Sequence, residues 1–147
     1  MIAALANGQS EIAGLLDASD PTSTRRCLSA LGIEFEWNGA LLRVYGRGLR
    51  GLQAPKGVLD AGNSGTTIRL LSGILAGQPF ASTITGDESL RTRPMRRVIE
   101  PLSQMGARLD ATPEGTPPLD ILGEFPLQPI EYRMPMSSAQ VKSAVLF

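Results

Sequence analysis

The sequence contains no histidine and a single cysteine, Cys27, among its 147 residues. One cysteine excludes an internal disulfide and a cysteine-based metal cluster. Without histidine, the chain also lacks the residue that most often binds a metal or acts as a general base near neutral pH. This composition is typical of a protein that works in a reducing cytoplasm, and we expect that location.

Long apolar runs are missing as well. No stretch reaches the roughly 18 consecutive apolar residues that a membrane-spanning helix needs. The first residues, "MIAALANGQSE", carry no basic region and are interrupted at Asn7 and Gly8, which excludes a secretory signal peptide. We therefore expect a protein without a membrane partner.

An excess of charge of either sign is also absent, because 14 basic residues are balanced by 14 acidic ones. A neutral chain offers no general attraction to nucleic acid or to a membrane surface. An anion that binds this protein must therefore be held by a local group of residues.

Sixteen glycines and eleven prolines divide the sequence into short elements, and hydrophobic periodicity assigns their types. The pattern predicts helices at 1–7, 21–31, 64–77, 94–106 and 138–147. It predicts strands at 10–16, 33–37, 41–46, 57–60, 80–86, 107–111, 119–123 and 129–134.

The order of these elements repeats. The segment "LSALGIEFE" at 28–36 resembles "LSQMGARLD", which begins 74 residues later, and "LANGQ" at 5–9 resembles "LAGQ" at 75–78. The repeated unit is β-α-β-α-β-β, with a period of about 70 residues. We expect an α/β (α+β) fold with about two units, one near 1–56 and one near 57–128, and the start of a third at 129–147. On this pattern the chain starts within its first unit and stops within its third.

A glycine-rich turn, "DAGNSGTTIR" at 60–69, connects a strand to the helix predicted at 64–77. Gly62 and Gly65 permit a tight turn, and Asn63, Ser64 and Thr66 are potential helix caps. The free N–H groups and the dipole of a helix start attract anions, and Arg69 lies one turn further on. Two interpretations remain open at this point: a well-capped helix and an anion site. The turn lacks the lysine of a P-loop, which disfavours a nucleotide.

Arginines are concentrated in "GDESLRTRPMRRVIEPL", residues 86–102. Arg91 and Arg93 precede Pro94, which we expect at the first helical position. Guanidinium groups bind carboxylate and phosphate groups with two parallel hydrogen bonds, so an anionic ligand is a natural hypothesis. For Arg96 and Arg97 we favour a structural interpretation, a solvated helix face with ion pairs to nearby acidic residues. Those acidic residues are Asp87, Glu88 and Glu100.

The last segment, "MSSAQVKSAVLF" at 136–147, has the composition of a capped amphipathic helix. Ser137 and Ser138 are potential caps, and Gln140 and Lys142 are polar groups near the helix start. Only the equivalence of this helix to the one at 64–77 argues for a binding role, since loops at equivalent ends of repeated units converge on one face.

These three segments, in this order and at this spacing, resemble the N-terminal domain of the 5-enolpyruvylshikimate-3-phosphate synthase family, in bacterial form. The resemblance covers nearly the whole chain. It implies the enolpyruvyl transferase fold and a transferase of the shikimate pathway of aromatic amino-acid biosynthesis. The implied reaction transfers the enolpyruvyl group of phosphoenolpyruvate to shikimate 3-phosphate, without a metal or another cofactor.

The resemblance also implies site residues. Asn63, Gly65 and Thr66, together with Arg93, match residues on the phosphoenolpyruvate side, and Arg69 supports them. Four residues match the turn that holds shikimate 3-phosphate: Ser137, Ser138, Ala139 and Gln140. Gly65 also matches the glycine of forms that the herbicide glyphosate inhibits.

The family has a second domain, which supplies the acid/base carboxylates, and a lysine-serine-arginine turn in its first unit. Neither is found in this chain, so the resemblance implies a partial N-terminal domain that is inactive alone and partners with the missing domain, in cis or in trans. Two other functions remain open: a fragment of the UDP-sugar enolpyruvyl transferase and a non-catalytic anion-binding module. A reactive cysteine in a long loop would favour the UDP-sugar enzyme, and Cys27 lies instead within a predicted helix.

Overall fold

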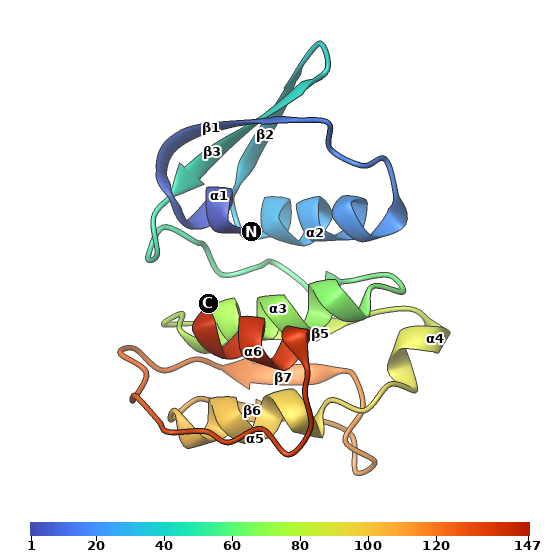
Figure 1. Ribbon diagram of the computed structural model, residues 1–147, viewed down its shortest axis with the longest axis vertical. Coiled ribbons are helices and arrows are strands. Elements are labelled where there is room, and N and C mark those ends of the chain that lie inside the picture. Colours follow the sequence, from blue (N-terminus) through green and yellow to red (C-terminus); the bar gives the residue numbers. More distant parts are fainter.

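The computed structural model describes residues 1–147 as two layered halves that share one hydrophobic core (Figure 1). The helices are α1 (Ile2–Leu5), α2 (Ser19–Ala30), α3 (Gly65–Ala76), α4 (Glu88–Arg91), α5 (Arg96–Gln104) and α6 (Ala139–Leu146). The strands are β1 (Asn7–Ala13), β2 (Glu34–Asn38), β3 (Leu41–Arg47), β4 (Leu59–Asp60), β5 (Ala81–Thr85), β6 (Arg108–Asp110) and β7 (Leu119–Leu122). This mixture of helix and sheet is the fold class that the sequence predicts.

Two sheets carry the strands. The first has the order β1-β3-β2 and is antiparallel throughout. The second has the order β4-β5-β7-β6, in which β4 and β5 are parallel and the remaining pairs are antiparallel. Strands β5, β7 and β6 therefore have the same order and directions as β1, β3 and β2. In the first sheet no strand occupies the place that β4 takes in the second.

Helix α3 lies at the centre of the molecule, beside α6 (Figure 1). Ten of its twelve residues are buried, so this helix is enclosed on nearly all sides, and its apolar residues belong to the hydrophobic core. The close approach of α6 depends on Gly73, because a Cβ at this position would collide with the backbone carbonyl of Ala144. The start of α3 is thereby held at a fixed place between the two halves.

Most predicted elements are present, and three details differ. Residues 129–134 form no strand and belong to neither sheet. The turn before Pro94 contains the short helix α4, which Asp87 caps by accepting a hydrogen bond from the backbone N–H of Leu90. Pro94 is not the first helical residue, since α5 begins at Arg96.

None of the helices combines the length and the hydrophobicity needed to cross a bilayer.

We predict that Gly73→Ala destabilises the fold, because its methyl group would push α3 and α6 apart. Overpacking of this kind costs about 1–3 kcal/mol in the free energy of unfolding. Urea denaturation followed by circular dichroism measures the change. Gly57→Ala is the matched control, since a Cβ there meets no atom within 4 Å. Equal stability of the two variants would show that α3 and α6 do not require this close contact.

Candidate functional site

The start of α3 is the place where the three segments from the sequence meet. Ser64 caps the helix, and its hydroxyl accepts a hydrogen bond from the backbone N–H of Thr67 at 3.1 Å. Gly65 and Thr66 follow in the first turn, where N–H groups have no partner within the helix. Gly65 is buried and Thr66 is exposed, so the first turn of α3 is open to solvent on one side.

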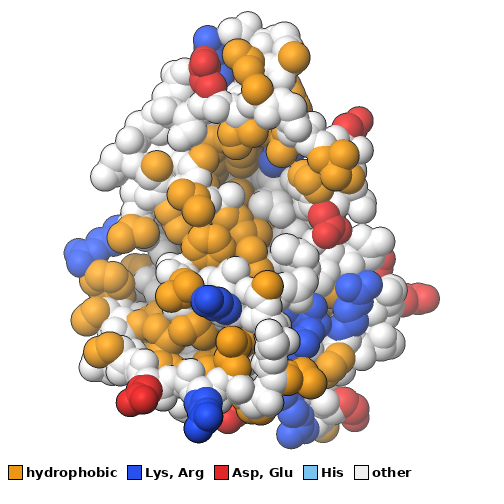
Figure 2. Space-filling view, viewed as in Figure 1, with side chains coloured by type: hydrophobic (Ala, Val, Ile, Leu, Met, Phe, Trp, Pro, Cys, Tyr) orange, Lys and Arg blue, Asp and Glu red, His pale blue; other side chains and the backbone are white.

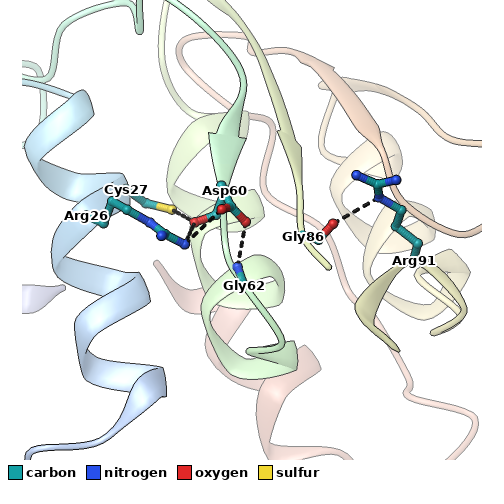
Figure 3. Close-up of polar contacts among 6 residues, drawn as sticks. All are labelled: Arg26, Cys27, Asp60, Gly62, Gly86 and Arg91. Atoms are coloured by element: carbon teal, nitrogen blue, oxygen red, sulfur yellow. Dashed lines mark hydrogen bonds and ion pairs between the residues drawn. The ribbon is translucent and has the colours of Figure 1, made fainter. Parts of the chain in front are cut away.

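Asp60 fixes the turn that precedes α3 (Figure 3). Its carboxylate accepts a hydrogen bond from the backbone N–H of Gly62 at 2.8 Å and forms an ion pair with Arg26 at 3.0 Å. Gly62 has a φ of 59°, a conformation that favours glycine. The backbone carbonyl of Asp60 also accepts hydrogen bonds from Arg26 and from the Cys27 thiol. Helix α2 thus holds the end of β4 and, through it, the glycine-rich turn.

Cys27 is almost completely buried, at 1% exposure. Burial is the main reason that its pKa rises to about 11, and the nearby Arg26 opposes this rise. The side chain therefore remains a neutral thiol at physiological pH. A reactive cysteine would instead be present as a thiolate. Its role is to donate a hydrogen bond to Asp60, in a helix and not in an exposed loop.

Arg69 is buried, and all of its hydrogen-bond partners are neutral oxygens. Its Nη1 donates to the side-chain oxygen of Gln140 at 2.8 Å and to the carbonyl of Gly65 at 3.4 Å. Its Nη2 donates to the carbonyl of Pro94 at 3.4 Å. These bonds join α3, the turn before α5 and the start of α6. No carboxylate lies within ion-pair distance of the guanidinium.

Gln140 completes the connection between α6 and α3. Its side-chain nitrogen donates to the hydroxyl of Thr66 at 3.0 Å, while its oxygen accepts from Arg69. Gln140 stands near the start of α6, where Ser138 is the cap and accepts a hydrogen bond from the backbone N–H of Val141 at 3.3 Å. One amide side chain therefore orients both Arg69 and Thr66.

Arg93 reaches the same point from the turn between α4 and α5. A Cβ placed on Gly65 would lie 2.9 Å from Nη1 of Arg93 and 2.8 Å from Nη1 of Arg69. The ends of the two guanidinium groups therefore both lie close to the space that a side chain at position 65 would occupy. The only hydrogen bond of the Arg93 side chain is a long one, 3.4 Å, to the hydroxyl of Ser89, which leaves further donors free for a ligand.

The electrostatics of this cluster are those of an anion site. The pKa of Arg69 is lowered, first by burial and then by the positive charges of Arg97 and Arg93. An uncompensated positive potential at a helix start attracts negatively charged groups. In Figure 2, basic side chains gather on the right of the lower half, over the region where Figure 1 places α4 and the start of α3.

The structure brings five of the predicted site residues into one cluster: Gly65, Thr66, Arg69, Arg93 and Gln140. Ser138 is next to this cluster as the cap of α6. Asn63, Ser137 and Ala139 are exposed. The polar side chains of Asn63 and Ser137 make no hydrogen bond within the chain.

The expected ion pairs of Arg96 and Arg97 do not form. No carboxylate lies within 4 Å of either guanidinium, since the four ion pairs of the structure are Arg26–Asp60, Arg43–Glu11, Arg43–Glu36 and Arg47–Glu34. Arg96 donates instead to the carbonyl of Pro113 at 3.0 Å. Asp87 caps α4 and pairs with neither arginine. Arg97 is half-buried, so the interpretation as a solvated face is wrong for this residue.

Comparison with known proteins gives consistent matches along the whole chain. The family model described as EPSP synthase (3-phosphoshikimate 1-carboxyvinyltransferase) matches residues 1–147. The 3-phosphoshikimate 1-carboxyvinyltransferase of Herpetosiphon aurantiacus is 54% identical over 144 residues, which are 97% of this chain and 33% of that protein. The protein of the same name from Solibacter usitatus is 54% identical over 147 residues, which are 100% of this chain and 34% of that protein.

A solved structure matches as well. The structure of EPSP synthase from Acinetobacter baumannii superimposes with a TM-score of 0.94 at 43% sequence identity, over 98% of this chain and 33% of that one. The chain thus spans about a third of the length of the curated relatives it matches.

We predict that Gly65→Ala weakens anion binding at the start of α3. The added methyl group would displace the ends of the Arg69 and Arg93 side chains. Loss of one charge-assisted hydrogen bond corresponds to roughly a tenfold higher dissociation constant. Isothermal titration calorimetry with inorganic phosphate measures the effect, with Gly57→Ala as the control that retains wild-type affinity. Unchanged phosphate affinity in Gly65→Ala would place the anion elsewhere.

Proposed function

The chain belongs to the EPSP synthase family, and from this membership we propose that it forms part of an enzyme that transfers the enolpyruvyl group of phosphoenolpyruvate to shikimate 3-phosphate. The observation that carries the proposal is the hydrogen-bonded connection from Arg69 through Gln140 to Thr66. It joins the segments that match the two substrate sides of the family. Both substrates are phosphorylated anions, and arginines with free donors suit them.

Two sides of the site follow from this assignment. Residues Asn63, Gly65, Thr66 and Arg93 bind phosphoenolpyruvate, and the buried Arg69 supports them. The turn at the start of α6 binds shikimate 3-phosphate with Ser137, Ser138, Ala139 and Gln140. Gln140, on the shikimate 3-phosphate side, forms hydrogen bonds with Arg69 and Thr66 on the phosphoenolpyruvate side. We propose that it thereby holds the two substrates at a fixed separation.

The reaction needs a proton for the methylene carbon of phosphoenolpyruvate. The 5-hydroxyl of shikimate 3-phosphate then attacks the cation-like carbon and loses its proton. Phosphate leaves from the tetrahedral intermediate as the new methyl group gives up a proton, which restores the C=C bond of the enolpyruvyl group. The arginines of this chain stabilise the negative charge of the phosphate as the bond to carbon breaks. The cluster contains no carboxylate and no histidine to move any of these protons. We therefore propose that the chain alone binds substrate and does not complete the reaction.

We also propose the organisation of the chain within such an enzyme. Residues 1–56 form a β-α-β-α-β-β unit without its first strand, residues 57–128 form a second unit, and residues 129–147 begin a third, all within an N-terminal domain. The shared strand order of the two sheets supports this division. A second domain, in cis or in trans, supplies the groups that transfer protons.

Two other functions fit parts of the sequence. A UDP-sugar enolpyruvyl transferase would be favoured by a reactive cysteine in a loop, and Cys27 is a buried thiol in α2. A non-catalytic anion-binding module needs only the arginine cluster. Binding of a UDP-sugar in preference to shikimate 3-phosphate would identify the first of these alternatives. Binding of phosphate with no preference for either substrate would identify the second.

We predict that shikimate 3-phosphate binds to the chain in a calorimetric titration, and more tightly when phosphoenolpyruvate is present. Gln140→Ala should abolish this coupling, because Gln140 is the link between α6 and Thr66. The exposed Gln128 provides the matched control, Gln128→Ala. Phosphate release should appear only after a separately produced second domain is added.

Two results would contradict the proposal. A chain that is folded by circular dichroism and binds neither substrate would refute the assignment of the site. Phosphate release by the chain alone would refute the requirement for a second domain.

A further inference from the structure

Arg97, which the sequence predicts on a solvated helix face, is half-buried and close enough for its charge to act on Arg69. It stands in the first turn of α5, four residues after Arg93. The Nε atoms of Arg97 and Arg69 are both buried, and neither has a hydrogen-bond partner. No carboxylate lies within ion-pair distance of Arg69, Arg93 or Arg97. Three cations are thus present in one region without an acidic counterpart.

The position of Arg97 links this positive charge to the start of α6. Arg97 lines a cavity of about 240 Å³ together with Ser138 and Val141, the two residues joined by the cap hydrogen bond of α6. Glu100 and Tyr132 also border this cavity, without a hydrogen bond or ion pair to Arg97. Arg97 therefore lies near the turn proposed to bind shikimate 3-phosphate.

This arrangement is unfavourable in the free protein. Arg97 lowers the pKa of Arg69, and its effect is larger than that of Arg93. A cation in the first turn of a helix also opposes the helix dipole. Like charges at partly buried positions repel each other more strongly than charges in water do, because the effective dielectric constant is lower. A bound anion would remove this repulsion.

We propose that Arg97 is a positioning residue of the anion site, whose charge acts through Arg69 and Arg93 to raise the affinity for a phosphorylated ligand. The inference rests on the proposed function. It assigns to Arg97 an electrostatic role that needs no contact with the ligand. Arg97 therefore increases ligand affinity and lowers the stability of the free protein.

Two variants at this position separate charge from shape. Arg97→Gln removes the charge, and Arg97→Lys retains it. Arg96→Gln is the control, because Arg96 is the exposed neighbour and donates only to the carbonyl of Pro113. The measurements are calorimetric titration with inorganic phosphate and with shikimate 3-phosphate, and thermal unfolding of the free protein.

We expect Arg97→Gln to weaken the binding of both ligands by roughly three- to tenfold, from the loss of one nearby charge. The melting temperature of its free form should be equal to or higher than that of the wild type. Arg97→Lys should retain most of the affinity, and Arg96→Gln should bind as the wild type does.

Two results would overturn the inference while leaving the proposed function in place. One is wild-type affinity in Arg97→Gln. The other is weak binding in both Arg97→Gln and Arg97→Lys together with lower melting temperatures, which would show a structural role. A wild-type chain that binds neither ligand would overturn the proposed function, and this inference with it.

Discussion

The arrangement of the site depends on a buried arginine that has no acidic partner. Arg69 is 5% exposed and donates only to neutral oxygens of Gly65, Pro94 and Gln140. Burying a charge without a counter-ion is costly, and a protein normally places a carboxylate beside it. Here the three acceptors come from three separate parts of the chain. The hydrogen bonds of one guanidinium therefore hold together the segments that carry the site, and its charge stays available to a ligand.

Two further constraints place the start of α3 where Arg69 needs it. Gly73 lets α6 approach α3 closely enough for Gln140 to reach both Arg69 and Thr66. Asp60 ties the glycine-rich turn to α2 through Arg26 and the backbone of Gly62. Gly65 then leaves room for the ends of Arg69 and Arg93, which lie where a side chain at position 65 would be. Small residues and one carboxylate thus organise a site whose binding groups are cationic.

Sequence reasoning finds the features that depend on local chemistry. The caps Ser64 and Ser138 are predicted because hydroxyl groups accept hydrogen bonds from free N–H groups at a helix start, and both do so. The fold class follows from the repeated order of helices and strands, and the family follows from three ordered motifs. The features that depend on distant contacts are missed. Residues 129–134 have the composition of a strand but no neighbouring strand to pair with. Arg97 resembles a surface residue in the sequence, whereas in the fold it is half-buried and shares a cavity with the start of α6.

The central claim is that residues from α3 and α6 respond to one anion at the start of α3. Heteronuclear NMR during a phosphate titration tests this most directly, through the backbone amides of Gly65 and Thr66, the side-chain amide of Gln140 and the Nε–H of Arg69. The account predicts that all four signals shift along a single binding curve, while the amide of Gly57 stays unchanged. Signals of Gln140 that remain still while those of Gly65 shift, or shifts confined to another part of the chain, would contradict it.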